Sequence, residues 1–148
     1  MDAEALRLEV VLLRPGAVLP ARQSALASGF DLHACLDGGR LEVGTMPVRV
    51  PTGVAIAAPP DTDVQIRPRS GLTARGVMAT FGTIDADYRG ELQVTMYCLS
   101  DVGTYVIEDG ERIAQLVVAR LATVEWVAVT SLDTTARGEQ GHGSTGRA

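Results

Sequence analysis

Cysteine, basic charge and long apolar runs are all scarce in this sequence of 148 residues. The only two cysteines, Cys35 and Cys98, form no C-x-x-C pattern and no Cys/His cluster, which argues against a disulfide framework or a zinc site. The formal net charge is −5, so counterion release has no basic face to act through and we expect no nucleic-acid partner. No run reaches the roughly 18 apolar residues of a membrane span, and the first residues are acidic where a secretory signal is basic. We therefore expect a soluble, cytoplasmic protein without a membrane partner.

Helical periodicity is missing as well, because no window of about eleven residues holds a continuous apolar stripe at helical spacing. Sixteen glycines and seven prolines instead separate short apolar runs that are rich in β-branched residues. From Glu91 to Met96 polar and apolar side chains alternate, which is the pattern of a strand with one solvated face. The predicted strands cover residues 6–13, 48–57, 64–66, 91–99, 104–107, 114–121 and 124–131.

Many short strands joined by turns predict an all-β domain of the sandwich, barrel or jelly-roll type. The length and the content of 46% hydrophobic and 21% charged residues fit one globular domain, which we place at residues 1–136. Residues 137–148 are rich in glycine and contain no aliphatic side chain larger than alanine, so little can offset the entropy of ordering them. We predict that this C-terminal arm is mobile.

Two segments combine charges and glycine in ways that suit nucleotide chemistry. Residues 67–72 place two arginines and Ser70 before Gly71, and these are donors that phosphate oxygens accept, although a solvated turn would look the same. Residues 82–90 place Asp85 and Asp87 beside Tyr88 in a hairpin-like connection. A carboxylate there could act as a base or a metal ligand, and an ordinary acidic turn is the alternative.

Two polar residues stand alone among apolar neighbours. Asp31 needs a charged partner or a metal if it is buried, although it could also stabilise a turn. Gln115 interrupts an apolar run and could be a core amide with satisfied hydrogen bonds.

The C-terminal arm combines glycines with Arg137, Ser144 and Thr145. Closely spaced backbone N–H groups in such a segment can form an anion nest, which favours a lid over a polyphosphate, while composition alone also fits disorder. The spacing lacks the lysine of a P-loop.

Taken in order, five strings resemble the five motifs of the trimeric dUTPase family: SGFDLHA, RPRSGL, GTIDADYRGEL, GERIAQLV and RGEQGHGSTG. Together they span nearly the whole chain. The resemblance implies a jelly-roll, β-clip-like homotrimer with three active sites at subunit interfaces, each closed by a neighbour's arm. It also implies a magnesium-dependent hydrolase that cuts dUTP to dUMP and pyrophosphate, limiting dUTP and supplying dUMP for thymidylate synthesis.

By the same resemblance, Asp85 is the general base that deprotonates the attacking water, and Gln115 helps to hold that water. Asp31 anchors Mg2+, through water, while the phosphates bind the ion directly. The resemblance assigns the phosphate chain to Arg69, Ser70 and Gly71, uracil to the main chain of Gly82, Thr83 and Ile84, deoxyribose to Tyr88, and closure over the substrate to Arg137, His142, Gly143, Ser144 and Thr145.

Three features depart from the family pattern. His142 stands where phenylalanine commonly stacks on uracil, so affinity is expected to depend on pH. Gln140 replaces a usual glycine, which excludes a glycine-only backbone conformation at that position. The segment of residues 76–82 is shorter than usual and lacks an asparagine near the uracil edge, so we expect uracil selectivity either to be weaker or to depend on the main chain and Thr80.

Two other functions fit parts of the pattern. A dCTP deaminase, either monofunctional or bifunctional, shares the fold but needs a glutamate near the base, and Glu91 is the candidate to check. A catalytically silent trimer that senses nucleotide would have no need of a water-activating carboxylate, so Asp85, Gln115 and Arg137 argue against it.

Overall fold

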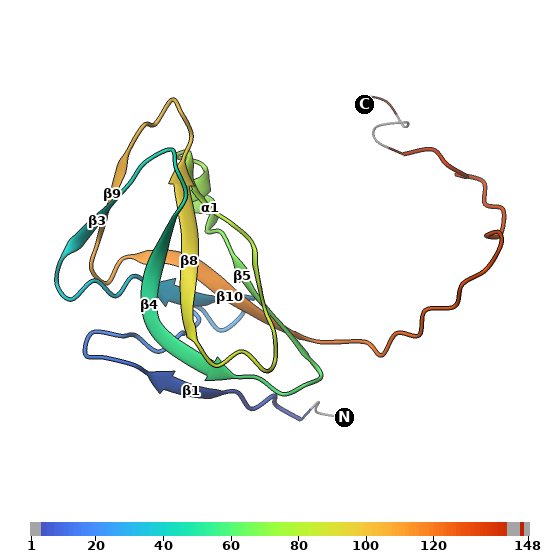
Figure 1. Cartoon of the computed structure of the whole chain (residues 1–148), viewed down its shortest axis with the longest axis horizontal. Helices are drawn as coiled ribbons and strands as arrows, with labels where there is room; N and C mark the ends of the chain where they lie inside the picture. Colours follow the sequence, from blue (N-terminus) through green and yellow to red (C-terminus); the bar gives the residue numbers. More distant parts are fainter. Residues whose placement is uncertain (1–3, 142–145, 147–148) are drawn as a thin grey trace.

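The computed structural model describes residues 4–141 and residue 146, and it contains three antiparallel sheets (Figure 1). The first sheet has the order β1-β4-β8-β6, the second β2-β10-β5-β7, and β3 pairs with β9 alone. The strands are β1 (Glu9–Leu12), β2 (Phe30–His33), β3 (Arg40–Val43), β4 (Val48–Ala57), β5 (Thr62–Arg67), β6 (Val77–Ala79), β7 (Gly82–Ile84), β8 (Glu91–Cys98), β9 (Tyr105–Glu108) and β10 (Arg112–Arg120). The one helix within the described residues, α1 (Ser70–Thr73), is a single turn. The predicted all-β fold is confirmed.

The core lies between the two four-stranded sheets, and each sheet contributes inward-facing branched side chains to it. The alternation predicted for β8 is observed, because Leu92, Val94 and Met96 are buried while Gln93 between them is exposed. The largest fully buried apolar side chains are Leu32, Val43, Val50, Val54, Val64, Val77, Leu92, Val94, Met96, Ile107 and Ile113.

A bulge in β4 interrupts the regular pairing of this strand with β8. The pairing of β4 with β8 shifts register between Pro51 and Ala55, and Gly53 within the bulge has φ of +70°. A Cβ atom there would lie 2.7 Å from the Ala17 side chain, so the close approach of the loop before β2 also requires glycine. The hydroxyl of Thr52 donates to the Leu92 carbonyl oxygen at 2.6 Å and holds the two strands together across the irregularity.

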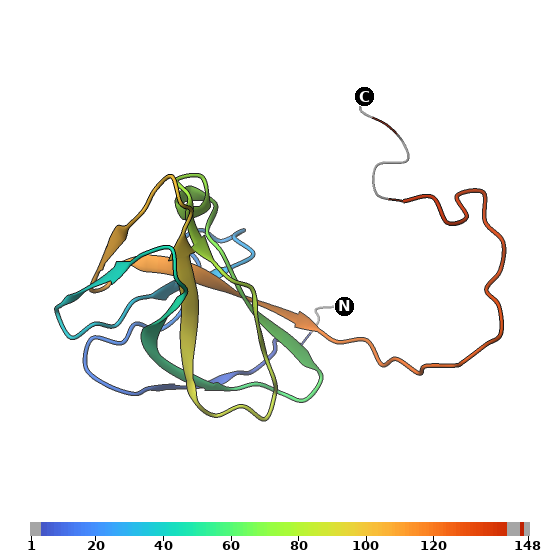
Figure 2. The same ribbon diagram turned by 45° about the horizontal axis from the view of Figure 1, so that its top comes forward.

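The prediction of a strand at residues 124–131 is wrong. This segment carries the β-branched residues of a strand, but no strand of the described chain lies beside it to supply hydrogen-bond partners, and it is exposed along its length. Figures 1 and 2 show that the chain leaves the end of β10 and runs away from the sheets. We call residues 121–136 the exit segment.

Four strands were not predicted, namely β2, β3, β6 and β7, and each has only three or four residues. No helix of the described residues is long and apolar enough to cross a bilayer.

Candidate functional site

Asp31 lies on β2 between two arginines from other parts of the chain. The residue is buried, and its Oδ2 atom lies 3.3 Å from Nη1 of Arg112, while Oδ1 lies 3.6 Å from Nε of Arg69. Arg69 also donates from Nη1 to the main-chain oxygen of Arg112 at 2.9 Å. The charged partner that the sequence required for a buried Asp31 is thus a pair of guanidinium groups.

Gln115 lies next to this group because β10 pairs with both β2 and β5. Its register partners are Asp31 on β2 and Arg67 on β5, and its Nε2 atom donates to the Pro68 carbonyl oxygen at 2.9 Å. A Cβ atom on Gly29 would lie 1.9 Å from Oε1 of Gln115, so the amide occupies the space that a side chain at position 29 would take. We call Asp31, Arg69, Arg112 and Gln115 the Asp31 cluster.

Ser70 and Gly71 begin α1, directly after Arg69, and both are exposed. A Cβ atom on Gly71 would meet no atom within 4 Å. No steric demand inside the chain therefore explains this glycine, and the surface around it is open to a ligand or to another chain.

A second group of predicted residues surrounds a pocket at the hairpin between β7 and β8. The pocket has a volume of about 250 Å3 and holds the side chains of Asp85 and Tyr88, with Thr83 and Ile84 on its wall. β7 pairs with β5 and β8 pairs with β4 and β6, so the two strands of the hairpin are not hydrogen-bonded to each other. Their separation leaves the pocket. We call it the hairpin pocket, and its lining residues are Arg49, Thr83, Ile84, Asp85, Tyr88, Glu91, Leu92 and Gln93.

The turn of the hairpin fixes Tyr88. Its main-chain N–H donates to the Asp85 carbonyl oxygen at 3.0 Å, and its hydroxyl donates to the Glu91 carbonyl oxygen at 2.9 Å. A Cβ atom on Gly90 would lie 2.4 Å from that hydroxyl, so glycine is needed for the ring to fold back over the turn. Gly82, also predicted as a uracil contact, pairs with Ile66 at the start of β7 and is not among the lining residues.

Glu91 lines the hairpin pocket, but its carboxylate is already engaged. Oε1 accepts a hydrogen bond from Nη2 of Arg14 at 2.6 Å and another from the main-chain N–H of Gly53 at 2.7 Å. The hydrogen bond from Arg14, aided by the one from Gly53, lowers the pKa of Glu91. A carboxylate held ionised in this way is a poor proton donor for chemistry on a nucleobase. The hypothesis of a dCTP deaminase is therefore not favoured.

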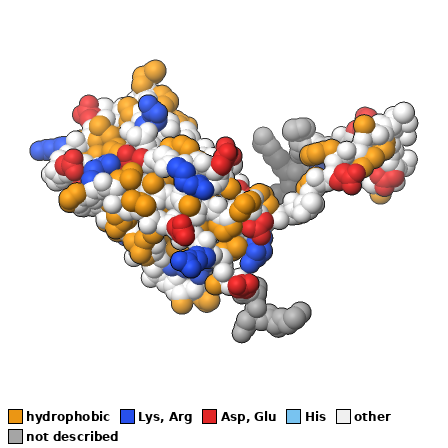
Figure 3. All heavy atoms as spheres, turned by 60° about the horizontal axis from the view of Figure 1, so that its bottom comes forward, with side chains coloured by type: hydrophobic (Ala, Val, Ile, Leu, Met, Phe, Trp, Pro, Cys, Tyr) orange, Lys and Arg blue, Asp and Glu red, His pale blue; other side chains and the backbone are white. Residues whose placement is uncertain are grey.

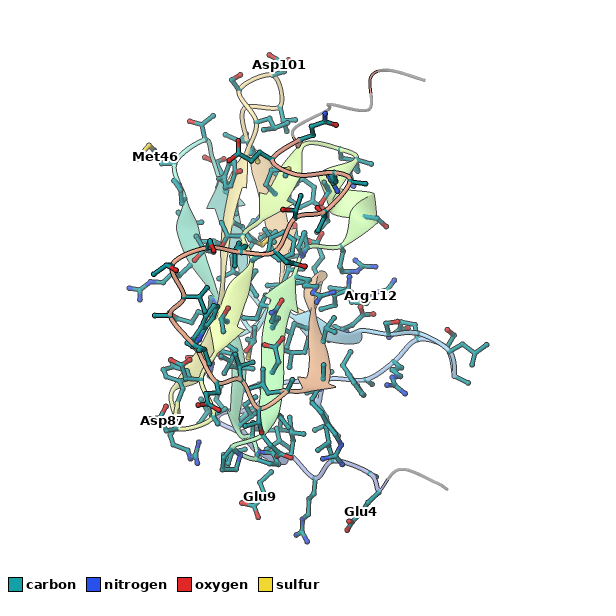
Figure 4. The ribbon with its side chains drawn as sticks, turned by 90° about the vertical axis from the view of Figure 1, so that its right-hand side faces the viewer. Glu4, Glu9, Met46, Asp87, Asp101 and Arg112 are labelled. Carbon is teal, nitrogen blue, oxygen red and sulfur yellow. The ribbon has the colours of Figure 1, made fainter. Side chains whose placement is uncertain are left out.

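The Asp31 cluster and the hairpin pocket are separate within one chain. None of the four residues of the Asp31 cluster lines the hairpin pocket. Figure 4 shows the same separation, with Arg112 on one side of the sheets and Asp87, in the hairpin turn, on the other. One copy of the chain therefore holds the predicted site residues in two separate places, which we call candidate half-sites.

Comparison with known proteins gives the family. The dUTPase family model matches residues 16–146. The chain is 46% identical to the deoxyuridine 5'-triphosphate nucleotidohydrolase of Treponema pallidum over 136 residues, covering 89% of this chain and 92% of that protein. The enzyme of the same name from Wolinella succinogenes is 44% identical, with 99% and 98% covered.

This chain belongs to the dUTPase family. Among solved structures it is similar to a dUTPase mutant of Staphylococcus bacteriophage 80alpha with dUpNHpp, with a TM-score of 0.81, 26% identity, and 95% and 99% of the two chains covered. A dUTPase mutant from phage phi11 of S. aureus, described with a structural Mg(II) ion, shares the fold with a TM-score of 0.75, 24% identity, and 86% and 99% covered. The family resemblance inferred from the five motifs is confirmed.

Of the C-terminal arm the structure describes residues 137–141 and 146, and none of these lines the hairpin pocket. Arg137 is exposed, and its Nε atom donates to the Gln140 carbonyl oxygen at 2.8 Å in a local turn. Gln140 is not among the residues with positive φ, in keeping with the loss of glycine there. The predicted arm contacts His142, Gly143, Ser144 and Thr145 lie outside the described residues.

The donor set of this dUTPase suits an ion that is held mainly by its substrate. No group of three or more His, Cys, Asp or Glu side chains could enclose a metal within the described part of the chain. Mg2+ commonly keeps several waters and binds through one or two carboxylates plus substrate phosphates. A single carboxylate at Asp31 fits that mode of binding.

Three arginines near the half-sites were not singled out in the sequence. Arg112 lay inside the string GERIAQLV, so its motif gave a signal, but its pairing with Asp31 depends on the β2–β10 register. Arg14 and Arg49 lie outside every motif and reach the hairpin from a loop and from β4. Only the three-dimensional structure shows their places.

Proposed function

We propose that this protein hydrolyses dUTP to dUMP and pyrophosphate, with Asp85 as the general base. One observation carries the proposal: Asp85 lines the hairpin pocket together with Tyr88, in a chain of the dUTPase family. A ligand analogue of dUTP was bound to the phage 80alpha dUTPase, which supports a deoxyuridine triphosphate as the substrate.

In this proposal deoxyribose packs against Tyr88 and uracil contacts the main chain of Thr83 and Ile84. Tyr88 leaves little room for a 2′-hydroxyl because its ring is fixed from both sides of the turn. Asp85 takes a proton from a water that Gln115 helps to orient, and the water attacks the α-phosphorus in line with the leaving pyrophosphate. Arg69, Ser70 and Gly71 bind the phosphate chain.

Mg2+, when bound with the triphosphate, neutralises charge on the phosphate oxygens. Asp31 would hold it through water. For that contact the carboxylate must share its oxygens with, or release, the guanidinium groups of Arg69 and Arg112, which lie within 3.6 Å of it.

We also propose that three copies assemble, because residues needed together lie apart in one chain. Asp85 and Gln115 belong to different half-sites, so a site that uses both requires the hairpin pocket of one copy against the Asp31 cluster of another. The exit segment supports assembly, since it exposes Trp126 at 93% and Leu132 at 86%. Figure 3 shows apolar side chains on this segment where it stands clear of the sheets.

A groove on the sheets offers a place for such a segment. It has a volume of about 530 Å3, and its apolar walls include Leu8, Val10, Phe30 and Val118. Large apolar surfaces that stay exposed in one chain are typical of interfaces in oligomers. Residues 137–148 would then reach a neighbour's half-sites and close over the phosphates.

We place the enzyme in the cytoplasm, where the two buried free thiols of Cys35 and Cys98 would stay reduced.

Trp126 provides a direct test of assembly because it is the only tryptophan. Docking of the exit segment on a partner should shift its fluorescence emission to shorter wavelength, and dilution until the copies separate should reverse the shift. Sedimentation equilibrium gives the number of copies. A monomer at micromolar concentration with solvent-like Trp126 emission would contradict the trimer.

The reaction is tested by pyrophosphate release with Mg2+ from dUTP, dCTP, dTTP and UTP at matched concentrations. Release from dUTP alone is the expected result. Release from none of the four would contradict the proposed function, and comparable release from dCTP would contradict its specificity while leaving the phosphate chemistry intact. A sensor without catalysis would bind dUTP and release no pyrophosphate.

A further inference from the structure

Arg49 lies in the hairpin pocket although it belongs to neither strand of the hairpin. It is on β4, where its register partner is Thr95 of β8, and its side chain reaches the pocket that holds Asp85 and Tyr88. Gln93, the exposed residue between two buried positions of β8, lines the same wall.

The positions of these residues along β8 divide the pocket into two ends. The turn of the hairpin carries Asp85 and Tyr88, and β8 begins directly after it at Glu91. An antiparallel strand rises about 3.4 Å per residue, so Gln93 lies roughly 7 Å and Thr95 roughly 14 Å beyond Glu91. Arg49 and Gln93 therefore mark the end of the pocket that is farther from the turn.

The proposed function sets the direction of the nucleotide in this pocket. With the α-phosphorus at Asp85 and the sugar at Tyr88, the base points away from the turn, toward Arg49 and Gln93. The length of a pyrimidine nucleoside is similar to the distance between these two ends of the pocket.

Charge at the far end is unbalanced. The other acid on the wall, Glu91, is engaged by Arg14 and by the Gly53 N–H. Arg49 takes part in none of the ion pairs within 4.0 Å that join described residues. Its guanidinium thus faces the pocket as a group that only donates hydrogen bonds.

We propose that Arg49 is a specificity-determining residue that donates a hydrogen bond to the carbonyl oxygen at position 4 of uracil, with Gln93 beside it. Cytosine carries an amino group at that position, which would meet the guanidinium donor to donor, and this mismatch rejects dCTP. The inference rests on the proposed function, because that function sets the direction of the base.

The test compares Arg49→Met, which keeps the aliphatic stem and removes all donors, with Arg49→Lys, which keeps the positive charge. Arg40→Met on β3 is the matched control, since Arg40 is exposed and lines neither half-site. Kinetics with dUTP and dCTP in Mg2+ give kcat and KM. For Arg49→Met we expect KM for dUTP to rise about tenfold or more with kcat within about threefold, and the ratio of kcat/KM for dUTP over dCTP to fall about tenfold or more. Arg49→Lys should lie between Arg49→Met and the unaltered protein, and the control should match the latter.

Inhibition by dUMP and dUDP shows which part of the nucleotide Arg49 touches. A contact with the base weakens both inhibitors by the same factor. A larger loss for dUDP would place Arg49 on the phosphates and overturn the inference, as would an unchanged ratio of dUTP to dCTP. If circular dichroism shows that Arg49→Met does not fold, Arg49→Gln replaces a group that only donates with an amide that donates and accepts, and the ratio of kcat/KM for dUTP over dCTP should fall again. A wild-type protein that releases no pyrophosphate refutes the proposed function itself, whereas normal wild-type turnover with unaltered selectivity in Arg49→Met refutes this inference alone.

Discussion

In the hairpin pocket the carboxylate of Asp85 is exposed and joins no ion pair among the described residues, whereas the carboxylate of Asp31 is buried between two guanidinium groups. The pocket is open and its shape is fixed by bonds within the hairpin turn. In the Asp31 cluster both oxygens of the carboxylate already face guanidinium groups. Under the proposed function, the half-site for sugar and base is open in a single chain, whereas Asp31 must share or release its guanidinium partners before it can hold the metal.

Asp85→Asn should give the largest effect because it removes the base and leaves the pocket in place. We expect kcat to fall by at least about 10³-fold, near the upper part of the range for general base catalysis. Binding of dUpNHpp, measured by calorimetry, should stay within about threefold of wild type. Asp87→Asn in the same turn is the control and should keep most activity; equal losses in both variants would remove the special role of Asp85.

Truncation after Thr135 tests whether the open pocket needs a lid. No described residue of the arm belongs to the core, so thermal unfolding and sedimentation should match the full chain. Turnover should fall by about 10²-fold, because transition-state contacts to the phosphates are lost. Monomerisation or unfolding of the truncated chain would show that residues 136–148 serve the fold and would contradict a lid.

Asp31→Asn tests whether the buried carboxylate of the Asp31 cluster takes part in metal binding. The variant keeps the shape of the side chain and removes its charge, so we expect the Mg2+ concentration for half-maximal activity to rise about 10- to 100-fold. Electron paramagnetic resonance of Mn2+ with dUpNHpp measures the same change without turnover. Asp101→Asn, in the exposed turn before β9, should leave both values unchanged. Unaltered metal dependence in Asp31→Asn would leave the carboxylate a purely structural partner of Arg69 and Arg112.

Arg14→Met should give the smallest effect, on stability. Arg14 holds the pKa of Glu91 below its ordinary value, so the pair stabilises the fold above the unfolded-state pKa of Glu91, and this contribution is lost as the pH falls through the lower folded pKa. We expect the free energy of unfolding to fall by about 1 kcal/mol at pH 7. Urea unfolding should show a smaller difference from wild type below about pH 4. A difference that does not change with pH would mean that packing, and not charge, accounts for the loss.

The sequence predicted the strands whose apolar pattern is long and regular. β4 matches the predicted range, and the alternation in β8 corresponds to its buried and exposed faces. The same reasoning failed at residues 124–131, where the pattern of a strand is present but no partner strand is supplied by the described chain. β7 was missed because its three residues begin with glycine and carry too little pattern to read.

The candidate site divides in the same way. Motifs identified Asp31, Asp85, Tyr88 and Gln115, since each stands out against its neighbours in sequence. They could not identify Arg14 and Arg49, because the contacts of these arginines depend on a loop and a strand brought beside the hairpin by folding. Long-range pairing, and not residue type, decides which of the thirteen basic residues reach the pocket.

Gly29 carries no functional group, yet the amide of Gln115 fills the space that a methyl group would take there. The side chain at position 115 therefore limits the size of the residue at position 29. Any larger residue at position 29 must displace the Gln115 side chain, so a substitution in the loop before β2, without any chemistry of its own, would change the position of the amide that the proposed function assigns to the attacking water.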